Sequence, residues 1–301
     1  MLYDTNMEKT LTVFTPTFNR AYCLDKCYNS LVNQTSKDFL WLIIDDGSSD
    51  NTVKLVDNWI LEDKIVIKYI YQENKGMHGA HNAAYENIST SLNVCIDSDD
   101  YMPINAVEII LNEWPNIKNN SSYAGIIGLD VYKTGIIIGS KIPNNLKKVK
   151  LENLYALHNV TGDKKLVYKT EVIKKYPLYP VFPGEKLVPL SLLYEMIDKD
   201  YDLYPINKPL CVVEYQEDGS SLNIFRQYIK NPKGFITYRK YKMKNGLTFY
   251  IRFKNACHYV ASKLILRDFR IVSTSAKPAL AFLAIPFGVL LYFYYWMKVK
   301  F

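Results

Sequence analysis

Two acidic clusters, each directly behind a short apolar run, are the residues of this sequence best suited to chemistry. Asp45 and Asp46 open an acidic turn at 45–50 behind the run 41–44, and residues 97–100 follow the run 93–96. Short apolar runs bounded by turn residues are typical of buried strands. In an open α/β sheet, ligands bind at the carboxyl ends of the strands. The two clusters therefore predict one site built from two strand ends.

The spacing of Asp97 and Asp99 indicates metal chemistry. On an extended chain, side chains two residues apart project to the same face, so both carboxylates could reach one ion. Mg²⁺ or Mn²⁺ takes one or two protein carboxylates and fills its other positions with water and phosphate oxygens, which neutralises a diphosphate leaving group. Taken alone, the pair fits an ordinary solvated turn after a strand equally well.

The segments around these clusters alternate between strand and helix patterns. The predicted order is a strand at 11–15, a helix from the turn at 16–20 toward Leu31, the strand at 41–44, a helix capped by Asp50 or Asn51 through Ile60, and a strand at 65–71. Alternation of this kind is typical of a doubly wound sheet. We therefore predict an α/β fold with a mostly parallel central sheet flanked by helices.

Four motifs occur in a fixed order along this part of the chain. They are Thr-Pro-Thr-Phe-Asn-Arg at 15–20, Asp-Asp-Gly-Ser-Ser-Asp at 45–50, Asn74 and Gly76 with His81 and Asn82, and Asp-Ser-Asp-Asp at 97–100. Together they resemble the family 2 inverting glycosyltransferases of the GT-A fold, over roughly residues 10–220. Four motifs in order are more specific than any one of them.

The resemblance implies how a nucleotide-sugar donor would be held. Thr15, Pro16 and Asp46 would contact the base and ribose, Asp97 the ribose, and Asp99 with Asp97 a Mn²⁺ or Mg²⁺ ion. The donor-binding residues that it implies are Thr15, Pro16, Asn19, Asp46, Lys75, Gly76, His81, Asn82, Asp97 and Ser98. For Asp46, a helix N-cap or turn carboxylate is the alternative.

One position departs from the family pattern. Members often have Ala-Arg-Asn where this chain has Ala80, His81 and Asn82. A cation that could meet the diphosphate is thereby replaced by a His that is mostly neutral at pH 7. His81 could donate a hydrogen bond, with Lys75 or another cation taking over the phosphate contact. A surface His at a helix start is the alternative.

An inverting transfer needs a general base for the acceptor hydroxyl. The family places a Glu-Asp pair in the second half of the domain, and the matching residues here are Glu185 and Lys186. Glu185 is then the candidate base. It could equally be a carboxylate that stabilises a helix N-terminus, since an apolar helical pattern follows through Ile197.

Two loops are candidates for contact with the acceptor or the diphosphate. Gly162 and Asp163 lie where the acceptor pocket of the family begins. Asp218, in the acidic turn 215–221, resembles a closing loop of one bacterial subgroup. A plain strand-to-helix connection is the alternative for this turn.

The positive charge of the chain is concentrated near its C-terminus. Residues 225–301 contain fifteen Lys and Arg against one acid, Asp268, whereas the net charge of the whole chain is only +7. We predict a catalytic domain at 1–222 and a basic, aromatic, helical, membrane-associating region at 223–301. A basic amphipathic helix at 247–270 could lie on an anionic leaflet.

An uncharged segment at 279–297 follows this helix. Its nineteen residues would just cross a hydrocarbon core of ~30 Å. Pro286 and Gly288 interrupt it, so a full span, a re-entrant or interfacial hairpin, and a buried dimerisation helix all stay open, as does a homo-oligomer. The first nine residues lack the apolar core of a signal peptide, so we expect the catalytic part to stay in the cytosol.

The sequence, with the resemblance, predicts a metal-dependent inverting hexosyl- or N-acetylhexosaminyl-transferase of bacterial surface-polysaccharide synthesis. It would use a UDP-sugar and a lipid-linked saccharide acceptor at the cytoplasmic face of the plasma membrane. A non-catalytic protein that binds a nucleotide sugar or a membrane surface is the alternative. Nucleic-acid binding is disfavoured, because the basic residues coincide with a strongly apolar segment. A metal-dependent phosphohydrolase would not need the Asp46 loop.

Overall fold

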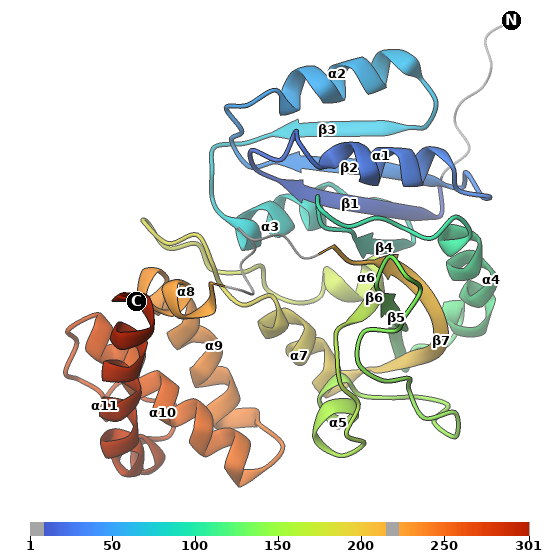
Figure 1. The fold of residues 1–301 in the computed structure, drawn as a ribbon. Coiled ribbons are helices and arrows are strands. Elements are labelled where there is room, and N and C mark those ends of the chain that lie inside the picture. The colour runs from blue at the N-terminus through green and yellow to red at the C-terminus, as the bar shows by residue number, and fades with distance from the viewer. Residues whose placement is uncertain (1–8, 215–222, 301) are drawn as a thin grey trace, which may run out of the picture. The chain divides into compact units, whose positions relative to one another are not determined.

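The central element of the fold is one mixed sheet. The computed structural model describes residues 9–214 and 223–300, and within them seven strands pair in the order β3-β2-β1-β4-β6-β5-β7. The strands are β1 (Leu11–Thr17), β2 (Phe39–Asp45), β3 (Ile67–Tyr71), β4 (Leu92–Cys95), β5 (Tyr123–Val131), β6 (Lys164–Lys169) and β7 (Asp202–Val212). Only β6 is antiparallel to its neighbours. The predicted mostly parallel sheet is confirmed (Figure 1).

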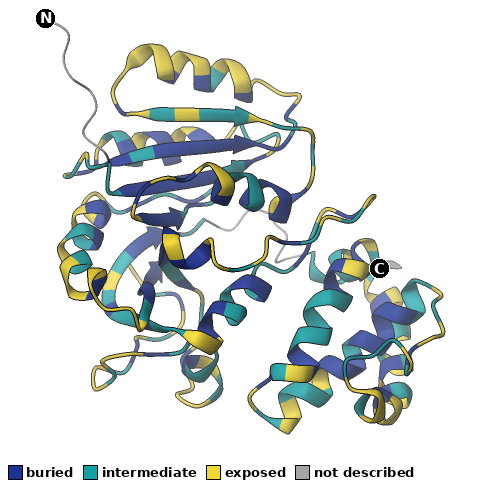
Figure 2. Cartoon of the chain, turned by 180° about the vertical axis from the view of Figure 1, so that it is seen from behind, coloured by how far each residue is buried: buried dark blue, intermediate teal, exposed yellow. Residues whose placement is uncertain are grey.

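Helices cover both faces of this sheet. They are α1 (Leu24–Val32), α2 (Thr52–Glu62), α3 (Met77–Asn87), α4 (Ala106–Lys118), α5 (Leu151–Ala156), α6 (Thr170–Ile173) and α7 (Ser191–Asp200). Helices α1, α2 and α4 share a core with Val13 and Trp41 of the sheet. On the opposite face, Phe14 packs against His81 and Tyr85 of α3. Figure 2 shows buried residues along the strands and exposed ones on the outer side of α2.

The described residues divide into two compact units. The first holds 9–74, 79–177 and 194–214, and the second holds 75–78, 178–193 and 223–300. The second unit thus contains the predicted C-terminal region together with two segments from earlier in the chain. The division into domains at 1–222 and 223–301 stays a prediction.

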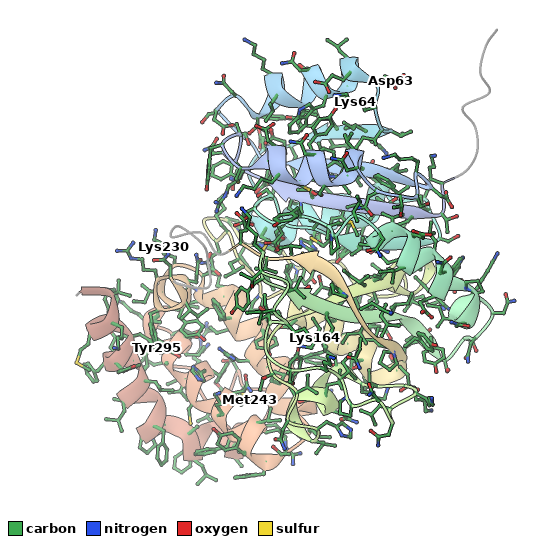
Figure 3. All side chains as sticks on the ribbon, turned by 45° about the vertical axis from the view of Figure 1, so that its right-hand side comes forward. Asp63, Lys64, Lys164, Lys230, Met243 and Tyr295 are labelled. Carbon is green, nitrogen blue, oxygen red and sulfur yellow. The ribbon has the colours of Figure 1, made fainter. Side chains whose placement is uncertain are left out.

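Four helices form most of the second unit. They are α8 (Ile224–Lys230), α9 (Pro232–Asn245), α10 (Phe249–Ile265) and α11 (Pro278–Lys300). Helices α9, α10 and α11 share a core with the loop residue Ile271, and this core consists of Met243, Ala256, Cys257, Tyr259, Val260, Ile271, Ala281 and Ala284. Figure 3 shows Met243 and Tyr295 in this unit. Helix α10 lies within the predicted helix 247–270. It begins at Phe249 because the Thr248 hydroxyl caps it by accepting from the Ile251 N–H at 3.2 Å.

Helix α11 is continuous, so the hairpin predicted as one alternative for 279–297 is wrong. Pro286 is exposed on this helix, and so is Phe282, the residue four positions earlier whose carbonyl cannot accept from the missing N–H. Gly288 allows a close approach, because a Cβ there would lie 2.4 Å from Cβ of Val260. Among the described helices, α11 is long and apolar enough over Pro278–Val299 to cross a membrane; its most apolar 18-residue stretch has a mean hydropathy of 1.7 and is 22% buried.

Candidate functional site

The carboxyl ends of several strands meet at one edge of the sheet. Strand β1 lies between β2 and β4 and is parallel to both, so the three strands end at the same edge. Thr17 at the end of β1 pairs with Asp45 of β2. Strand β4 ends just before Asp97 on the other side of β1. Strand β5 also ends at this edge and carries Asp130. The two acidic clusters therefore flank the same strand, as expected for one site.

The side chains of the second cluster alternate between open and buried positions. Asp97 and Asp99 are half-buried, whereas Ser98 and Asp100 are 7% and 6% exposed. Asp100 accepts a hydrogen bond from the Glu214 N–H at 3.1 Å, and burial raises the pKa of its carboxyl. The two half-buried carboxylates are therefore the pair that a ligand could reach.

These carboxylates fit a hard divalent cation. Among the described residues, no three His, Cys, Asp or Glu side chains gather into a ready metal cluster. Mg²⁺ and Mn²⁺ sites at diphosphates commonly use only one or two protein carboxylates, with phosphate and water completing the shell. Asp97 and Asp99 supply that donor set.

A lysine that the sequence analysis did not identify lies among the acidic groups. Lys165 of β6 pairs with Gly128 of β5, and its Nζ donates to the Cys95 carbonyl at 3.4 Å. Burial alone would lower the pKa of Lys165, but Cys211, Asp130 and Asp97 around it hold that pKa well above its usual range. Lys165 is therefore a permanent cation beside the carboxylates. The only sequence signal was a charged residue inside a strand pattern.

The first acidic cluster is organised by hydrogen bonds. The Asp45 carboxylate accepts from the Ser48 N–H at 2.7 Å and from the Tyr69 hydroxyl at 2.6 Å. Asp46 is 4% exposed and accepts from Gln72 Nε2 at 2.6 Å. Gln72, the residue after β3, thus helps to fix the position of the Asp46 carboxylate.

Asn19 connects the loop after β1 to the loop after β2. Its main-chain N–H donates to the Ser48 hydroxyl at 2.9 Å, and its side-chain Oδ1 accepts from the Ser49 N–H at 2.8 Å. Asn19 adopts a left-handed φ of 52°, which Asn tolerates better than most residues. The two predicted donor loops therefore form one connected structure.

The two threonines of β1 differ in their surroundings. The Thr15 hydroxyl accepts from Trp41 Nε1 at 2.9 Å in the core, so a nucleotide could meet only the main chain of Thr15 and the half-buried Pro16 beside it. The Thr17 hydroxyl is buried and has no hydrogen-bond partner among the described residues. Because buried polar groups are usually paired, Thr17 is a further candidate for ligand contact.

His81 is completely buried, so the alternative of a surface His is wrong. Its Nδ1 lies 3.2 Å from the Tyr85 hydroxyl and its Nε2 lies 3.7 Å from Cys95 Sγ. The ring meets Phe14 edge-on. Asn82, the next residue, is half-buried. The donor contacts proposed for these two residues stay predictions.

Lys75 and Gly76 belong to the second unit. Gly76 has a φ of +81°, and a Cβ there would lie 2.1 Å from the Lys186 carbonyl oxygen. The glycine is therefore required by close main-chain packing. Nearby, His78 Nδ1 accepts from the Val188 N–H at 3.2 Å, and burial lowers the pKa of this His. The side chain of Lys75 is exposed.

Glu185 holds the start of a helix. Its Oε1 accepts from the Lys233 N–H and its Oε2 from the Gly234 N–H, both at 2.9 Å. These are N–H groups of the first turn of α9, which have no partner within the helix. The side chain is 7% exposed. Glu185 thus caps α9 and not the helix that follows it in the chain, as the predicted alternative had it, and the role of general base stays a prediction.

The predicted acceptor residues Gly162 and Asp163 lie at the start of β6, at the same sheet edge as the acidic clusters. Lys164, labelled in Figure 3, organises their loop. Its Nζ donates to the carbonyls of Thr161 at 2.8 Å and Gly162 at 3.0 Å. Burial lowers the pKa of Lys164. Asp218 lies outside the described residues.

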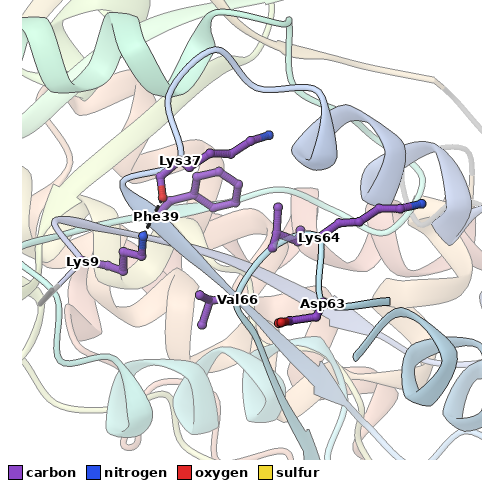
Figure 4. Close-up of a pocket in the computed structure, with 7 residues that line it drawn as sticks. Lys9, Lys37, Phe39, Asp63, Lys64 and Val66 are labelled. Atoms are coloured by element: carbon purple, nitrogen blue, oxygen red, sulfur yellow. Dashed lines mark hydrogen bonds between the residues drawn. The ribbon is translucent and has the colours of Figure 1, made fainter. Parts of the chain in front are cut away.

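A separate hollow lies at the amino ends of the strands. Its volume is about 190 Å³, and it is lined by Lys9, Lys37, Phe39, Asp63, Lys64, Ile65 and Val66 (Figure 4). Phe39 begins β2 and Val66 precedes β3. The hollow is therefore at the opposite edge of the sheet from the acidic clusters and is not part of the candidate site.

Comparison with known proteins gives one family. The model of glycosyl transferase family 2 matches residues 12–163. The chain is 33% identical over 228 residues to the GalNAc(5)-diNAcBac-PP-undecaprenol beta-1,3-glucosyltransferase of Campylobacter jejuni, covering 73% of this chain and 71% of that protein. It is 32% identical over 104 residues to the chondroitin synthase of Escherichia coli, covering 35% of this chain but only 15% of that much longer protein.

Two solved structures share the fold. TarS residues 1–349 of S. aureus, in complex with UDP-GlcNAc, superpose with a TM-score of 0.58 at 16% identity, covering 88% of this chain and 76% of that chain. The mannosyltransferase PcManGT of Pyrobaculum calidifontis, in complex with GDP-Man and Mn²⁺, gives 0.55 at 15% identity, covering 98% and 84%. At these identities the likeness is one of fold.

Proposed function

The chain belongs to glycosyltransferase family 2, and we propose that this glycosyltransferase is metal-dependent and inverting, with UDP as the carrier of its sugar. The observation that carries the proposal is the half-buried pair Asp97 and Asp99 at the same sheet edge as the Asp46 loop. TarS was solved with UDP-GlcNAc and PcManGT with GDP-Man, so the carrier is the point that needs a direct test.

The acidic pair would hold Mn²⁺ or Mg²⁺, with Asp99 as the main ligand and Asp97 shared between metal and ribose. When bound, the cation would offset the charge that develops on the leaving diphosphate. The chain itself would supply the rest. Asp46, fixed by Gln72, would accept hydrogen bonds from the base or ribose, and the joined loops at Asn19 and Ser49 would keep that contact rigid.

Glu185 remains the proposed general base on the strength of the resemblance. Its two hydrogen bonds from main-chain N–H groups occupy both carboxylate oxygens. A base role would therefore require the carboxylate to release at least one of these contacts when an acceptor binds. Inversion itself predicts a β-linked product from an α-linked donor, which the anomeric proton coupling of the product would reveal.

We propose a lipid-linked saccharide as the acceptor, at the cytoplasmic face of the membrane. Support comes from the Campylobacter relative, whose name describes a diphosphate-linked polyprenol glycan, and from the apolar helix α11. The expected result is a catalytic efficiency at least tenfold higher for a polyprenyl-diphosphate saccharide than for the same saccharide without the lipid. Equal values would exclude the lipid as a recognised group.

Thermal unfolding with UDP, GDP and dTDP, each with and without Mn²⁺, tests the donor site. Ligand at ~100 times its dissociation constant stabilises a fold by about 2.7 kcal/mol, which shifts the Tm measurably. We expect a Mn²⁺-dependent shift with UDP that Asp99→Ala abolishes. Asp57→Ala, which removes an exposed carboxylate on α2, is the matched control and should keep the shift. The absence of any shift in the wild type would refute the proposed donor class.

A further inference from the structure

Helix α11 has two opposite faces within the second unit. The inner face packs on α10 through small residues, Ala281, Ala284 and Gly288. At Gly288 the backbones approach so closely that an added Cβ would lie 2.9 Å from the Cys257 carbonyl oxygen. Farther along, the buried Tyr295 hydroxyl is hydrogen-bonded to His258 Nδ1 of α10. The helix is therefore held along its length by its neighbour.

The outer face of α11 is apolar and uncovered. Six of its large side chains are between 53% and 68% exposed: Phe282, Leu283, Phe287, Leu290, Phe293 and Met297. Their spacing places them on one side of a helix with 3.6 residues per turn. The helix contains no acidic residue. Soluble monomers rarely leave so large a continuous apolar surface in water, so this face has a partner.

The charges around this face favour an anionic partner. Lys277 and Lys298, at the two ends of α11, are both exposed. In the loop before the helix, Phe269 is 77% exposed and lies near Arg267, while its neighbour Arg270 is ion-paired with Asp268, the one acid of this region. Residues 225–301 carry fifteen basic side chains against one acid. A second copy would bring like charges together, whereas an anionic lipid leaflet would complement both the basic rim and the apolar face.

The packing of α11 decides between lying on a membrane and crossing it. Its length suffices for a span. However, its neighbour α10 carries Arg252, Lys254 and Lys263, and charged side chains at the bilayer centre are costly. To cross alone, α11 would have to leave α10 and expose Val260 and Tyr259, which are fully buried now. Lying on the surface preserves all of these contacts.

We propose that the outer face of α11 inserts into one anionic leaflet with its axis in the membrane plane, so that the second unit is a one-sided membrane anchor. The inference rests on the proposed function only for the presence of a membrane. Residues along the outer face would then reach one common depth in the leaflet. Lys277 and Lys298 would lie at the headgroups, as would Tyr294, whose ring centroid is 5.7 Å from Lys298 Nζ.

Depth measurements on the full chain with phosphatidylcholine vesicles containing phosphatidylglycerol test the orientation. Trp296 is the only Trp after residue 114, so Trp296→Phe supplies a blank in which Trp41, Trp59 and Trp114 of the first unit give the background fluorescence to be subtracted. Phe282→Trp and Leu290→Trp, each made in that blank, report two points about 12 Å apart along the helix. Brominated lipids should quench both equally and near the interface. Quenching of position 290 by bromines near the bilayer centre, with position 282 shallower, would show a span and overturn the proposal.

Vesicle co-sedimentation tests the partner. Leu290→Glu should weaken binding at least tenfold while leaving the Tm in solution unchanged, because Leu290 is 68% exposed. The matched control is Leu61→Glu, on the outer side of α2 and 83% exposed, which should bind as the wild type does. Vesicles of phosphatidylcholine alone should bind at least tenfold more weakly than the anionic ones.

Two other results would overturn the proposal. If the wild type fails to bind anionic vesicles, the face does not dock on a membrane. If Leu290→Glu converts a dimer into a monomer, measured by light scattering, and leaves vesicle binding intact, a second copy covers the face. Neither result touches the UDP-dependent Tm shift, so failure of this inference and failure of the donor assignment are distinguishable.

Discussion

The Glu185 carboxylate accepts a hydrogen bond from the Gly234 main-chain N–H at 2.9 Å. This contact joins the residue predicted as a catalytic base to the first turn of α9, and Lys233 donates to the other carboxylate oxygen. A capping contact of this kind typically contributes about 1 kcal/mol. Glu185 therefore has a structural role whether or not it also takes a proton.

Glu185→Gln should lower the stability of the protein by about 1 kcal/mol, because the amide NH₂ can no longer accept a hydrogen bond from one of the two N–H groups. Urea unfolding monitored by circular dichroism measures this. The same variant tests the base role. A roughly hundredfold or larger loss of turnover, with nucleotide binding retained, supports it; unchanged turnover per folded molecule leaves only the cap.

Lys165→Met should destabilise the protein when no divalent metal is present. Removing this cation leaves Asp97 and Asp130 without a compensating charge, at a cost on the order of 2 kcal/mol. Mn²⁺ should then raise the Tm of the variant more than that of the wild type. Lys169→Met is the control, because Lys169 lies at the other end of β6 and donates to the Asn120 carbonyl. An identical Mn²⁺ response in both variants would argue against the role of Lys165.

Some of these features could be predicted from the sequence and others could not. Apolar runs and the acidic turns behind them are local patterns, so the sheet and the common edge of Asp46 and Asp97 were predictable. The partners of Glu185 lie 48 and 49 residues later in the chain, and no local pattern indicates such a contact. Lys165 reaches the site because β6 inserts between β4 and β5, which is a property of topology.

The C-terminal segment illustrates a related limit. From the sequence, Gly288 predicts an interruption of the apolar helix, because glycine has a low helix propensity. In the structure it is the position of closest approach to Val260, so a tertiary contact outweighs the local preference. Which side of the helix is exposed could not be predicted from the sequence, because apolar residues occur all round the helix.

Gly288→Leu should therefore destabilise the second unit, because its side chain would overlap Val260 and the Cys257 carbonyl. Overpacking of this kind costs roughly 1–3 kcal/mol. Leu283→Ala, on the exposed side of the same helix, should change the Tm in solution by much less. Equal effects of the two substitutions would show that α11 is not held on α10 through Gly288.

Acid should weaken the second unit through His258. Burial lowers the pKa of His258 to about 3, and the charges of Arg239 and Lys254 add to the effect; its Nδ1 is paired with Tyr295 and its ring contacts Tyr228. Unfolded, this His titrates near 6.5. Its contribution to stability is therefore complete above pH 6.5 and is lost as the pH falls toward 3, by at most about 1.4 kcal/mol per pH unit.

Urea unfolding of the wild type and of His258→Gln at pH 7 and pH 5 measures this term. Between pH 7 and pH 5, the free energy of unfolding of the wild type should fall by roughly 2 kcal/mol more than that of the variant, since the Gln cannot take up a proton. Comparing the two proteins cancels the common contribution of the carboxylates. Parallel losses would mean that His258 does not control the acid response.

The same substitution at two positions of β1 separates stability from ligand binding. Thr15→Val should destabilise the protein by roughly 1–3 kcal/mol, because Trp41 Nε1 loses its buried acceptor. Thr17→Val should leave the stability unchanged or raise it, because the Thr17 hydroxyl has no hydrogen-bond partner among the described residues. Its removal eliminates the free-energy cost of burying an unpaired polar group.

Their effects on nucleotide affinity should be reversed. If the Thr17 hydroxyl serves the donor, Thr17→Val weakens UDP binding about tenfold, as loss of one buried hydrogen bond of about 1.4 kcal/mol would. Thr15→Val should not change it, because only the main chain of Thr15 can reach a nucleotide. Calorimetric titration of both folded variants with UDP and Mn²⁺ gives the answer. Unchanged affinity in Thr17→Val together with weakened affinity in Thr15→Val would contradict this prediction. The side chain of Thr15, and not that of Thr17, would then contact the donor.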